Sequence, residues 1–176
     1  MLDKRLPSIL PPMSLGEALE TTKTHSVFGR VKEKGFIHSR PFGAPNHTVS
    51  DVALVGGGQY PQPSKISLAH NSVFFLDELP EFKCSLLEVM RQPPEDLEVT
   101  ISRAKFTVTY PISFVMVASM NPSPSGYFNT SNITPMETQH YLSKISGPLL
   151  DRIDLHIELE PVAFEQLSEK KLGENS

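Results

Sequence analysis

The strongest pattern of apolar residues along the chain is the unbroken run at residues 73–76, which is followed at once by Asp77 and Glu78. A run of this kind is typical of a strand that is buried on both faces of a parallel sheet. A second apolar run, at residues 114–118, ends shortly before Asn121. We therefore predict two buried, neighbouring strands with polar side chains at their carboxyl ends.

The segments around these strands have other periodicities. Residues 82–90 place their apolar side chains at helical spacing. Residues 97–101 and 106–110 alternate apolar and polar positions on either side of Arg103-Ala104, which indicates a β-hairpin. Residues 155–159 are predicted to form a last strand.

Cap and turn residues place the remaining elements. Ser14 and Glu17 have the spacing of a capping box and predict that a helix begins there. Thr134, followed by proline, predicts a second helix start. Glycine- and proline-rich stretches at residues 28–50 and 56–63 predict loops. Strands that alternate with helices in this way favour a three-layer α/β domain.

Composition narrows the class of protein. The 176 residues, of which 39% are hydrophobic and 20% charged, suffice for one domain with its own core. No stretch approaches the ~18 consecutive apolar residues of a membrane span. The formal net charge of −4 argues against a surface built mainly to bind nucleic acid. The single cysteine, Cys84, excludes an internal disulfide and agrees with a cytoplasmic location.

Three positions are candidates for chemistry at the predicted strand ends. Asp77 and Glu78 are suited to nucleotide hydrolysis, in which the first carboxylate helps to hold Mg²⁺ and the second polarises the attacking water. Asn121 would sit at the end of the neighbouring strand, where an amide can orient water against a γ-phosphate. The simpler interpretations are an acidic end to a hydrophobic strand and an Asn-Pro turn, and each motif alone leaves both open.

Arg152 is a fourth candidate, in the segment ISGPLLDRIDLHIEL. A guanidinium group binds phosphate oxygens through two parallel hydrogen bonds, so this side chain is a candidate arginine finger toward a neighbouring subunit's nucleotide. The simpler interpretation is a surface ion pair with Asp151 or Asp154, which flank it.

The order of these motifs carries more information than any one of them. An Asp-Glu strand end, a hairpin, ASMNP and GPLLDRIDL resemble the AAA+ core of the magnesium-chelatase-like family, and its ComM-like (YifB-type) members in particular. The stretches KRLPSILPP, RPFGAPNHTVSDVALVGGG, ISLAHNSVFFLDELPEF and EVTISRA match as well. The resemblance extends over nearly the whole chain and implies ATP as ligand, with Mg²⁺ held through Asp77.

The resemblance also implies what this chain lacks. Family members carry the P-loop G-x-x-x-x-G-K-S/T directly before the segment that begins here at Met1, and no stretch of this chain fits it. The strand that leads into that loop would lie between residues 114–118 and 155–159. We therefore expect a fragment: a partial AAA+ core at residues 1–164, then the start of a helix at 165–176 toward an absent lid. Alone, it is not expected to hydrolyse ATP.

Partners follow from the same resemblance. Family members work as rings, here expected to be hexamers, and the hairpin with Arg103 and Lys105 resembles the pre-sensor hairpin of this clade, which can face the central pore. Our hypothesis is that these two cations contact DNA there. A solvated turn is the simpler interpretation of these two cations. The loop at residues 56–63 matches the helix-2 insert. Ser123 and Ser125 stand where many relatives have cysteines, so no zinc site is expected there.

Three functions remain open from the sequence. The first is a DNA motor of the ComM kind, in recombination or natural transformation. The second is the ATPase subunit of magnesium chelatase, which drives metal insertion into a tetrapyrrole. The third is a catalytically dead module that packs into rings of intact subunits and offers Arg152 to a neighbour.

Overall fold

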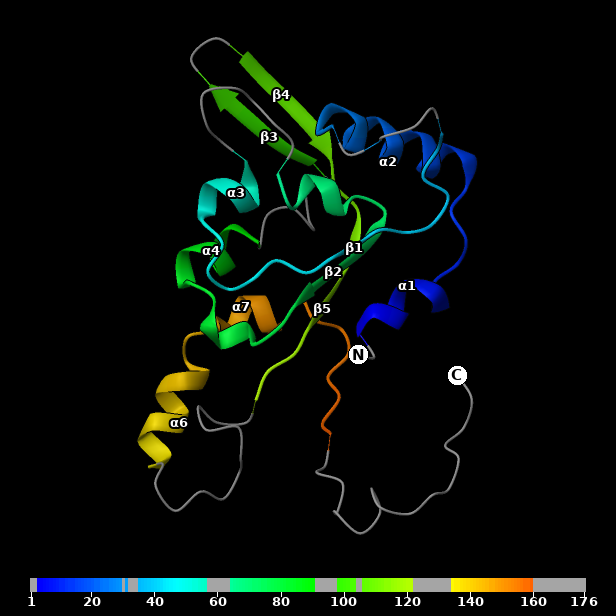
Figure 1. The fold of residues 1–176 in the computed structure, drawn as a ribbon. Coiled ribbons are helices and arrows are strands. Elements are labelled where there is room, and N and C mark those ends of the chain that lie inside the picture. The colour runs from blue at the N-terminus through cyan, green and yellow to red at the C-terminus, as the bar shows by residue number, and fades with distance from the viewer. Residues whose placement is uncertain are drawn as a thin grey trace, which may run out of the picture.

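The structure is a computed structural model, and it describes residues 3–29, 31, 35–56, 64–90, 98–103, 106–121 and 134–159. The centre of the fold is a three-stranded parallel sheet in the order β1 (Phe42–Gly43), β2 (Ser72–Leu76), β5 (Phe114–Ala118) (Figure 1). Lys105, most of the loop at 56–63 and all of 165–176 lie outside the described residues.

The two predicted strands are confirmed as β2 and β5, and they are neighbours. They pair in parallel from Ser72 opposite Phe114 to Leu76 opposite Ala118. β2 is the middle strand, and four of its five residues are buried, which explains its unbroken apolar sequence. The short edge strand β1 was predicted as loop, because two residues carry no alternation that a sequence pattern can detect.

The predicted hairpin is also confirmed. β3 (Glu98–Arg103) and β4 (Phe106–Pro111) pair antiparallel, with Arg103 opposite Phe106 at the closing end. The hairpin forms a sheet of its own and stands away from the parallel sheet in Figure 1. In the sequence, Ile112 belongs to the short link between β4 and β5, and its side chain is buried.

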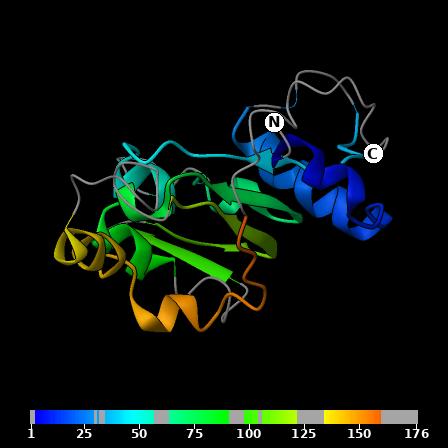
Figure 2. The same cartoon turned by 90° about the horizontal axis from the view of Figure 1, so that it is seen from below.

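Helices surround the sheet. Along the chain they are α1 (Leu6–Ile9), α2 (Leu15–Val27), α3 (Asp51–Val55), α4 (Cys84–Val89), α6 (Pro135–Leu142) and α7 (Gly147–Leu150). Short 3₁₀ turns are η1 (Asp3–Arg5), η2 (Ser67–Ala69) and η3 (Leu79–Glu81). In both Figure 1 and Figure 2, α1 and α2 lie on one side of the molecule and α6 on the opposite side.

Both predicted helix starts are confirmed by their hydrogen bonds. Ser14 Oγ accepts from the backbone N–H of Glu17 at 3.3 Å, and Glu17 Oε2 accepts from the backbone N–H of Ser14 at 2.7 Å. Thr134 and Glu137 make the same reciprocal pair at the start of α6. These bonds satisfy N–H groups that have no partner within the helix.

A polar clamp fastens α2 to the segment that enters β2. Arg40 donates to Glu17 Oε1 at 3.0 Å, to the carbonyl oxygen of Pro11 at 2.8 Å and to that of Asn71 at 3.2 Å. Asn71 adopts a left-handed backbone with φ of 57°, and its side-chain amide donates to Thr21 Oγ1 at 3.3 Å. One guanidinium group thus joins three segments that are distant in sequence.

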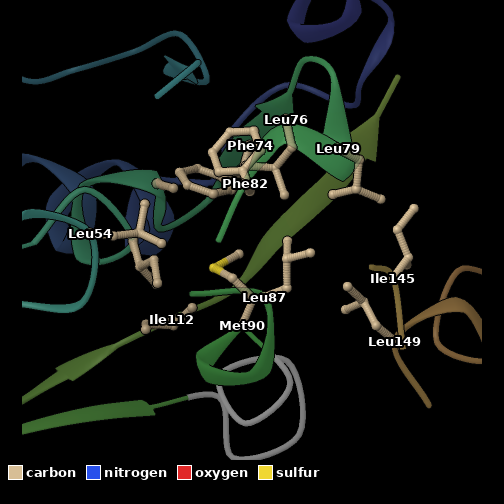
Figure 3. Packing of buried hydrophobic residues seen from close by; sticks show 12 residues of the cluster. Leu54, Phe74, Leu76, Leu79, Phe82, Leu87, Met90, Ile112, Ile145 and Leu149 are labelled. Carbon is tan, nitrogen blue, oxygen red and sulfur yellow. The ribbon is translucent and has the colours of Figure 1, made fainter. Parts of the chain in front are cut away.

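The core lies between β2, α4 and the segment around α7. Figure 3 shows Leu76 and Phe74 of β2 facing Leu87 of α4 and the adjoining Met90, with Leu149 of α7 beside them. The other members of this buried cluster are Leu54, Ile66, Ala69, Leu79, Phe82, Ile112 and Ile145. This packing fixes the carboxyl ends of β2 and β5 in place.

The predicted strand at residues 155–159 is wrong. These residues have no regular secondary structure, and Leu155, Ile157 and Leu159 are 81–82% exposed. A strand is held by backbone bonds to a neighbour. β5 pairs with β2 along one edge, and no strand of the described residues pairs along the other. With no partner there, the alternating apolar side chains of residues 155–159 remain in water.

Candidate functional site

The carboxyl ends of β2 and β5 lie side by side because the two strands are parallel and in register. Leu76 is opposite Ala118, so Asp77 and Ser119 are the next residues at the same edge of the sheet. Asp77 is exposed, and Ser119 is half-buried. In open α/β sheets this edge is where ligands bind.

Ser119 joins the two strand ends through four hydrogen bonds. Its backbone N–H donates to the carbonyl oxygen of Leu76 at 2.9 Å, and its own carbonyl oxygen accepts from the N–H of Leu79 at 2.9 Å. Its hydroxyl donates to Asp77 Oδ1 at 2.5 Å and accepts from the N–H of Glu78 at 3.4 Å. Sequence reasoning missed this residue, since a serine after an apolar run gives no signal of its own.

Glu78 has an unusual backbone. Its φ and ψ are both 55°, which is the left-handed region that a residue with a side chain seldom adopts. The 3₁₀ turn η3 follows, with Leu79 buried beneath it and the carboxylate of Glu78 exposed. Conformations of this kind cluster at active sites, where the surrounding packing holds them.

A histidine from another segment approaches this carboxylate. His47 Nδ1 lies 3.9 Å from Glu78 Oε2, and the two side chains are 40% and 49% exposed. The rings of His47 and Phe82 are also nearly perpendicular, at 84°, with 6.4 Å between their centroids. His47 belongs to the loop after β1, so the sheet order brings it to the site.

Tyr141 of α6 lies near the residues that follow both strand ends. Burial raises the pKa of its phenol, and the carboxylates of Glu81 and Glu78 raise that pKa further. The nearby backbone N–H of Asn121 lowers the pKa, against these effects. Tyr141 is therefore close to Glu78 and Asn121 at once. It was not singled out from the sequence, where it reads as an ordinary apolar position of a helix.

The structure thus brings three of the predicted residues to one edge of the sheet. Asp77 and Glu78 follow β2 directly, and Asn121 follows the adjacent strand β5 by three residues. All three side chains are exposed. This is an arrangement of two carboxylates and an amide that faces solvent beside a packed core.

Comparison with known sequences decides the family. The sequence model described as "Magnesium chelatase, subunit ChlI" matches residues 1–167. The chain belongs to this family. Within it, the chain is 49% identical over 164 residues to the competence protein ComM of Haemophilus influenzae and 45% identical over 161 residues to the uncharacterized protein YifB of Salmonella typhimurium. These matches cover 90% of this chain and 32% of each relative, so the chain spans about a third of their length.

A solved structure agrees with the fold. The complex between subunits BchI and BchD of magnesium chelatase matches with a TM-score of 0.52 at 15% identity, over 81% of this chain and 46% of that chain. At this level of identity the likeness concerns the fold alone. It confirms a partial AAA+ core with a mostly parallel sheet.

The remaining candidate residues of this ChlI-family chain lie elsewhere. Arg152 directly follows the C-cap of α7, and its backbone N–H donates to the carbonyl oxygen of Leu149 at 3.2 Å. Its side chain lines a cavity of about 400 Å³ along β5, together with Val115 and Asp154. Arg103 ends β3, while its side chain and the whole of Lys105 lie outside what the structure describes.

The donor set is compatible with Mg²⁺ bound together with a nucleotide. In the described part of the chain, no group of three or more histidine, cysteine or acidic residues is placed to hold a metal. Mg²⁺ in nucleotide sites typically uses one or two carboxylates, phosphate oxygens and water, and Asp77 supplies an exposed carboxylate whose Oδ1 is already hydrogen-bonded. Among the described helices, none has the length and apolar character to cross a membrane.

Proposed function

We propose that this chain supplies the hydrolytic edge of an AAA+ ATPase that works as a ring on DNA. The observation that carries the hydrolytic part is the convergence of Asp77, Glu78 and Asn121 at the carboxyl ends of two paired parallel strands. Membership of the ChlI family supports the assignment to this class of ATPase.

Each residue has a role in this proposal. Asp77 holds Mg²⁺, which would neutralise the charge that develops on the phosphate oxygens. Glu78 accepts a hydrogen bond from the attacking water and orients it toward the γ-phosphate. The amide of Asn121 binds the γ-phosphate side and senses whether it is present. The exposed position of all three side chains supports these roles, because the nucleotide must reach them from solvent.

Hydrolysis also requires a phosphate cradle. Residues 1–176 contain no G-x-x-x-x-G-K-S/T motif, so we place that motif outside this stretch of sequence. The relatives are about three times as long as the part that this chain matches. The proposed activity therefore belongs to an assembly in which a P-loop is brought to the edge occupied by Asp77.

The proposal that the subunits assemble into a ring rests on Arg152. Its side chain lies along β5 in a cavity whose lining does not include Asp77 or Glu78. In this proposal Arg152 serves as a finger toward a neighbouring subunit's nucleotide, and a closed hexamer would provide that neighbour for every subunit.

DNA is proposed as the substrate of the motor. The relative with 49% identity is named a competence protein, which favours a role in DNA uptake or recombination. Arg103 at the end of β3 and Lys105 would contact the phosphate backbone, one pair of cations from each subunit. ATP and chromosomal DNA are both available in the cytoplasm, where we place the activity.

An ATPase subunit of magnesium chelatase is the second candidate. The family description and the fold of the BchI–BchD complex both favour it. Such a subunit would couple hydrolysis to metal insertion into a tetrapyrrole and would have no use for DNA. The two candidates therefore differ in which molecule stimulates turnover.

A chimera tests the proposal. The whole chain replaces the matching third of Haemophilus influenzae ComM, and ATP hydrolysis is measured with and without single-stranded and double-stranded DNA. We expect hydrolysis that DNA stimulates. Hydrolysis unaffected by DNA would overturn the DNA assignment, and a chimera that forms the ring but neither binds nor hydrolyses ATP would overturn the ATPase assignment.

A further inference from the structure

We infer that Ser119 is a positioning residue that holds the carboxylate of Asp77 for Mg²⁺, an inference that rests on the ATPase function proposed above. Its hydroxyl group donates a hydrogen bond to Asp77 Oδ1. No motif of the sequence pointed to it, because its role depends on a strand that is more than forty residues upstream.

The backbone of Ser119 is fixed before its side chain acts. The bonds from its N–H to the Leu76 carbonyl oxygen and from the Leu79 N–H to its own carbonyl oxygen, both 2.9 Å, carry the β2–β5 pairing one residue beyond the strands. Leu76 and Leu79 are buried at 0% and 1% exposure. The serine is therefore attached to the core on both sides of the site.

The direction of the hydroxyl proton is also fixed. A serine hydroxyl has one proton to donate and lone pairs to accept with. The N–H of Glu78 points at Ser119 Oγ from 3.4 Å, so a lone pair is used there, and the proton is directed to Asp77 Oδ1 at 2.5 Å. The same oxygen thus links the two neighbouring carboxylate residues.

This arrangement has a consequence for cation binding. Asp77 is an exposed side chain, and its carboxylate would otherwise rotate between several orientations. With Oδ1 held by Ser119, the second oxygen is presented in one orientation, and less ordering is left to be done when Mg²⁺ binds. Groups that orient a metal ligand in this way are typically worth about 10- to 100-fold in metal affinity.

A purely structural role predicts something different. If Ser119 only tied the two strand ends together, its loss would lower stability and weaken nucleotide binding equally with and without Mg²⁺. If it positions Asp77, the loss appears only in the Mg²⁺-dependent part of binding. The two possibilities are separated by a binding measurement that does not depend on turnover.

The experiment compares Ser119→Ala, Ser119→Thr and the control Ser113→Ala in the ComM chimera. Ser113 precedes β5 at the opposite end, is exposed, and uses its backbone carbonyl oxygen, which the substitution keeps. A fluorescent ATP analogue is titrated in EDTA and at a series of Mg²⁺ concentrations, and thermal unfolding midpoints are recorded for each variant.

We expect Ser119→Ala to raise the Mg²⁺ concentration for half-maximal analogue binding by about 10-fold, with unchanged affinity in EDTA. Ser119→Thr keeps the hydroxyl and should stay close to the parent, as should Ser113→Ala. Equal Mg²⁺ dependence of Ser119→Ala and Ser113→Ala would overturn the inference, as would an equal loss in EDTA. A parent chimera that binds no analogue in either condition would overturn the proposed function itself, and the inference with it.

Discussion

The phenol of Tyr141 in α6 lies next to the backbone N–H of Asn121, in the segment that leaves β5, and that N–H lowers the pKa of the phenol. The same phenol is close to the carboxylates of Glu78 and Glu81. Lys144 is three residues further along the chain than Tyr141. Its Nζ lies 3.9 Å from Glu81 Oε1 and 5.7 Å from the centre of the Tyr141 ring. One buried side chain therefore lies next to both the predicted sensor residue and the predicted base.

Removal of that phenol oxygen should impair turnover more than nucleotide binding. Tyr141→Phe keeps the packed ring and removes the phenol oxygen beside the Asn121 N–H, which should cost no more than about 1 kcal/mol of stability. In the ComM chimera we expect a several-fold lower kcat with KM nearly unchanged. Tyr110→Phe is the matched control, because Tyr110 is also buried but belongs to the hairpin. A fall in kcat of equal size in both variants would assign the effect to general loosening of the fold.

Substitutions of the two acidic residues after β2 should impair different steps, nucleotide binding in one case and hydrolysis in the other. Asp77→Asn removes the charge proposed to hold Mg²⁺, so the Mg²⁺-dependent gain in nucleotide affinity should disappear. Glu78→Gln keeps that affinity and should lower kcat by about 10²- to 10⁴-fold, the usual contribution of a general base. Equilibrium binding and single-turnover hydrolysis measured on both variants check this. Identical binding defects in the two variants would contradict the division of roles.

Mixed rings should reveal whether Arg152 acts on a neighbour. Arg152→Ala and Glu78→Gln chimeras are each expected to be inactive alone. When mixed, a Glu78→Gln subunit offers its intact Arg152 to a neighbour with an intact Glu78, so hydrolysis should partly return. Hydrolysis is followed as the mixing ratio is varied, with the exposed Arg5→Ala variant as control. No recovery at any ratio, from subunits that still assemble, would contradict action between subunits.

The contact between Arg40 and Glu17 should make the free energy of unfolding depend on pH in the acidic range. The backbone N–H of Ser14 and then the Arg40 guanidinium hold the pKa of Glu17 below its ordinary value. A carboxyl with a lowered folded-state pKa stabilises the fold above its unfolded pKa, and that stabilisation is lost as the pH falls through the folded value. Glu17→Gln should therefore lower the free energy of unfolding at neutral pH. Below about pH 4.3, the free energy of unfolding of this variant should fall less steeply than that of the parent.

Loss of the guanidinium itself should be more costly than loss of its charge partner. Arg40 is only 15% exposed and donates to three acceptors, so Arg40→Ala should lower the free energy of unfolding by about 2 kcal/mol. Arg40→Lys keeps the charge but not the fork of donors, and it should recover little of that loss. Urea unfolding at neutral pH and at pH 4 compares these variants with Glu17→Gln. Full recovery by lysine would show that only charge matters at this position.

Local patterns in the sequence determined the elements that carry their own signals. The apolar runs of β2 and β5, the alternation of the hairpin and the caps at Ser14 and Thr134 all reflect the environment of a strand or the open N–H groups of a helix start. The candidates Asp77, Glu78 and Asn121 were found in the same way, because they stand directly after buried strands.

Only the tertiary structure decided how these elements meet. Residues 155–159 have the composition of a strand, but no strand in the described part of the chain pairs with them, and the two-residue β1 exists only because β2 pairs with it. The hydrogen bond of Ser119 to Asp77, the approach of Tyr141 to Asn121 and the left-handed backbone of Glu78 depend on strand register and core packing. Contacts between residues far apart in sequence leave no local pattern, so the chain must be folded before Ser119 and Tyr141 can be recognised as parts of the site.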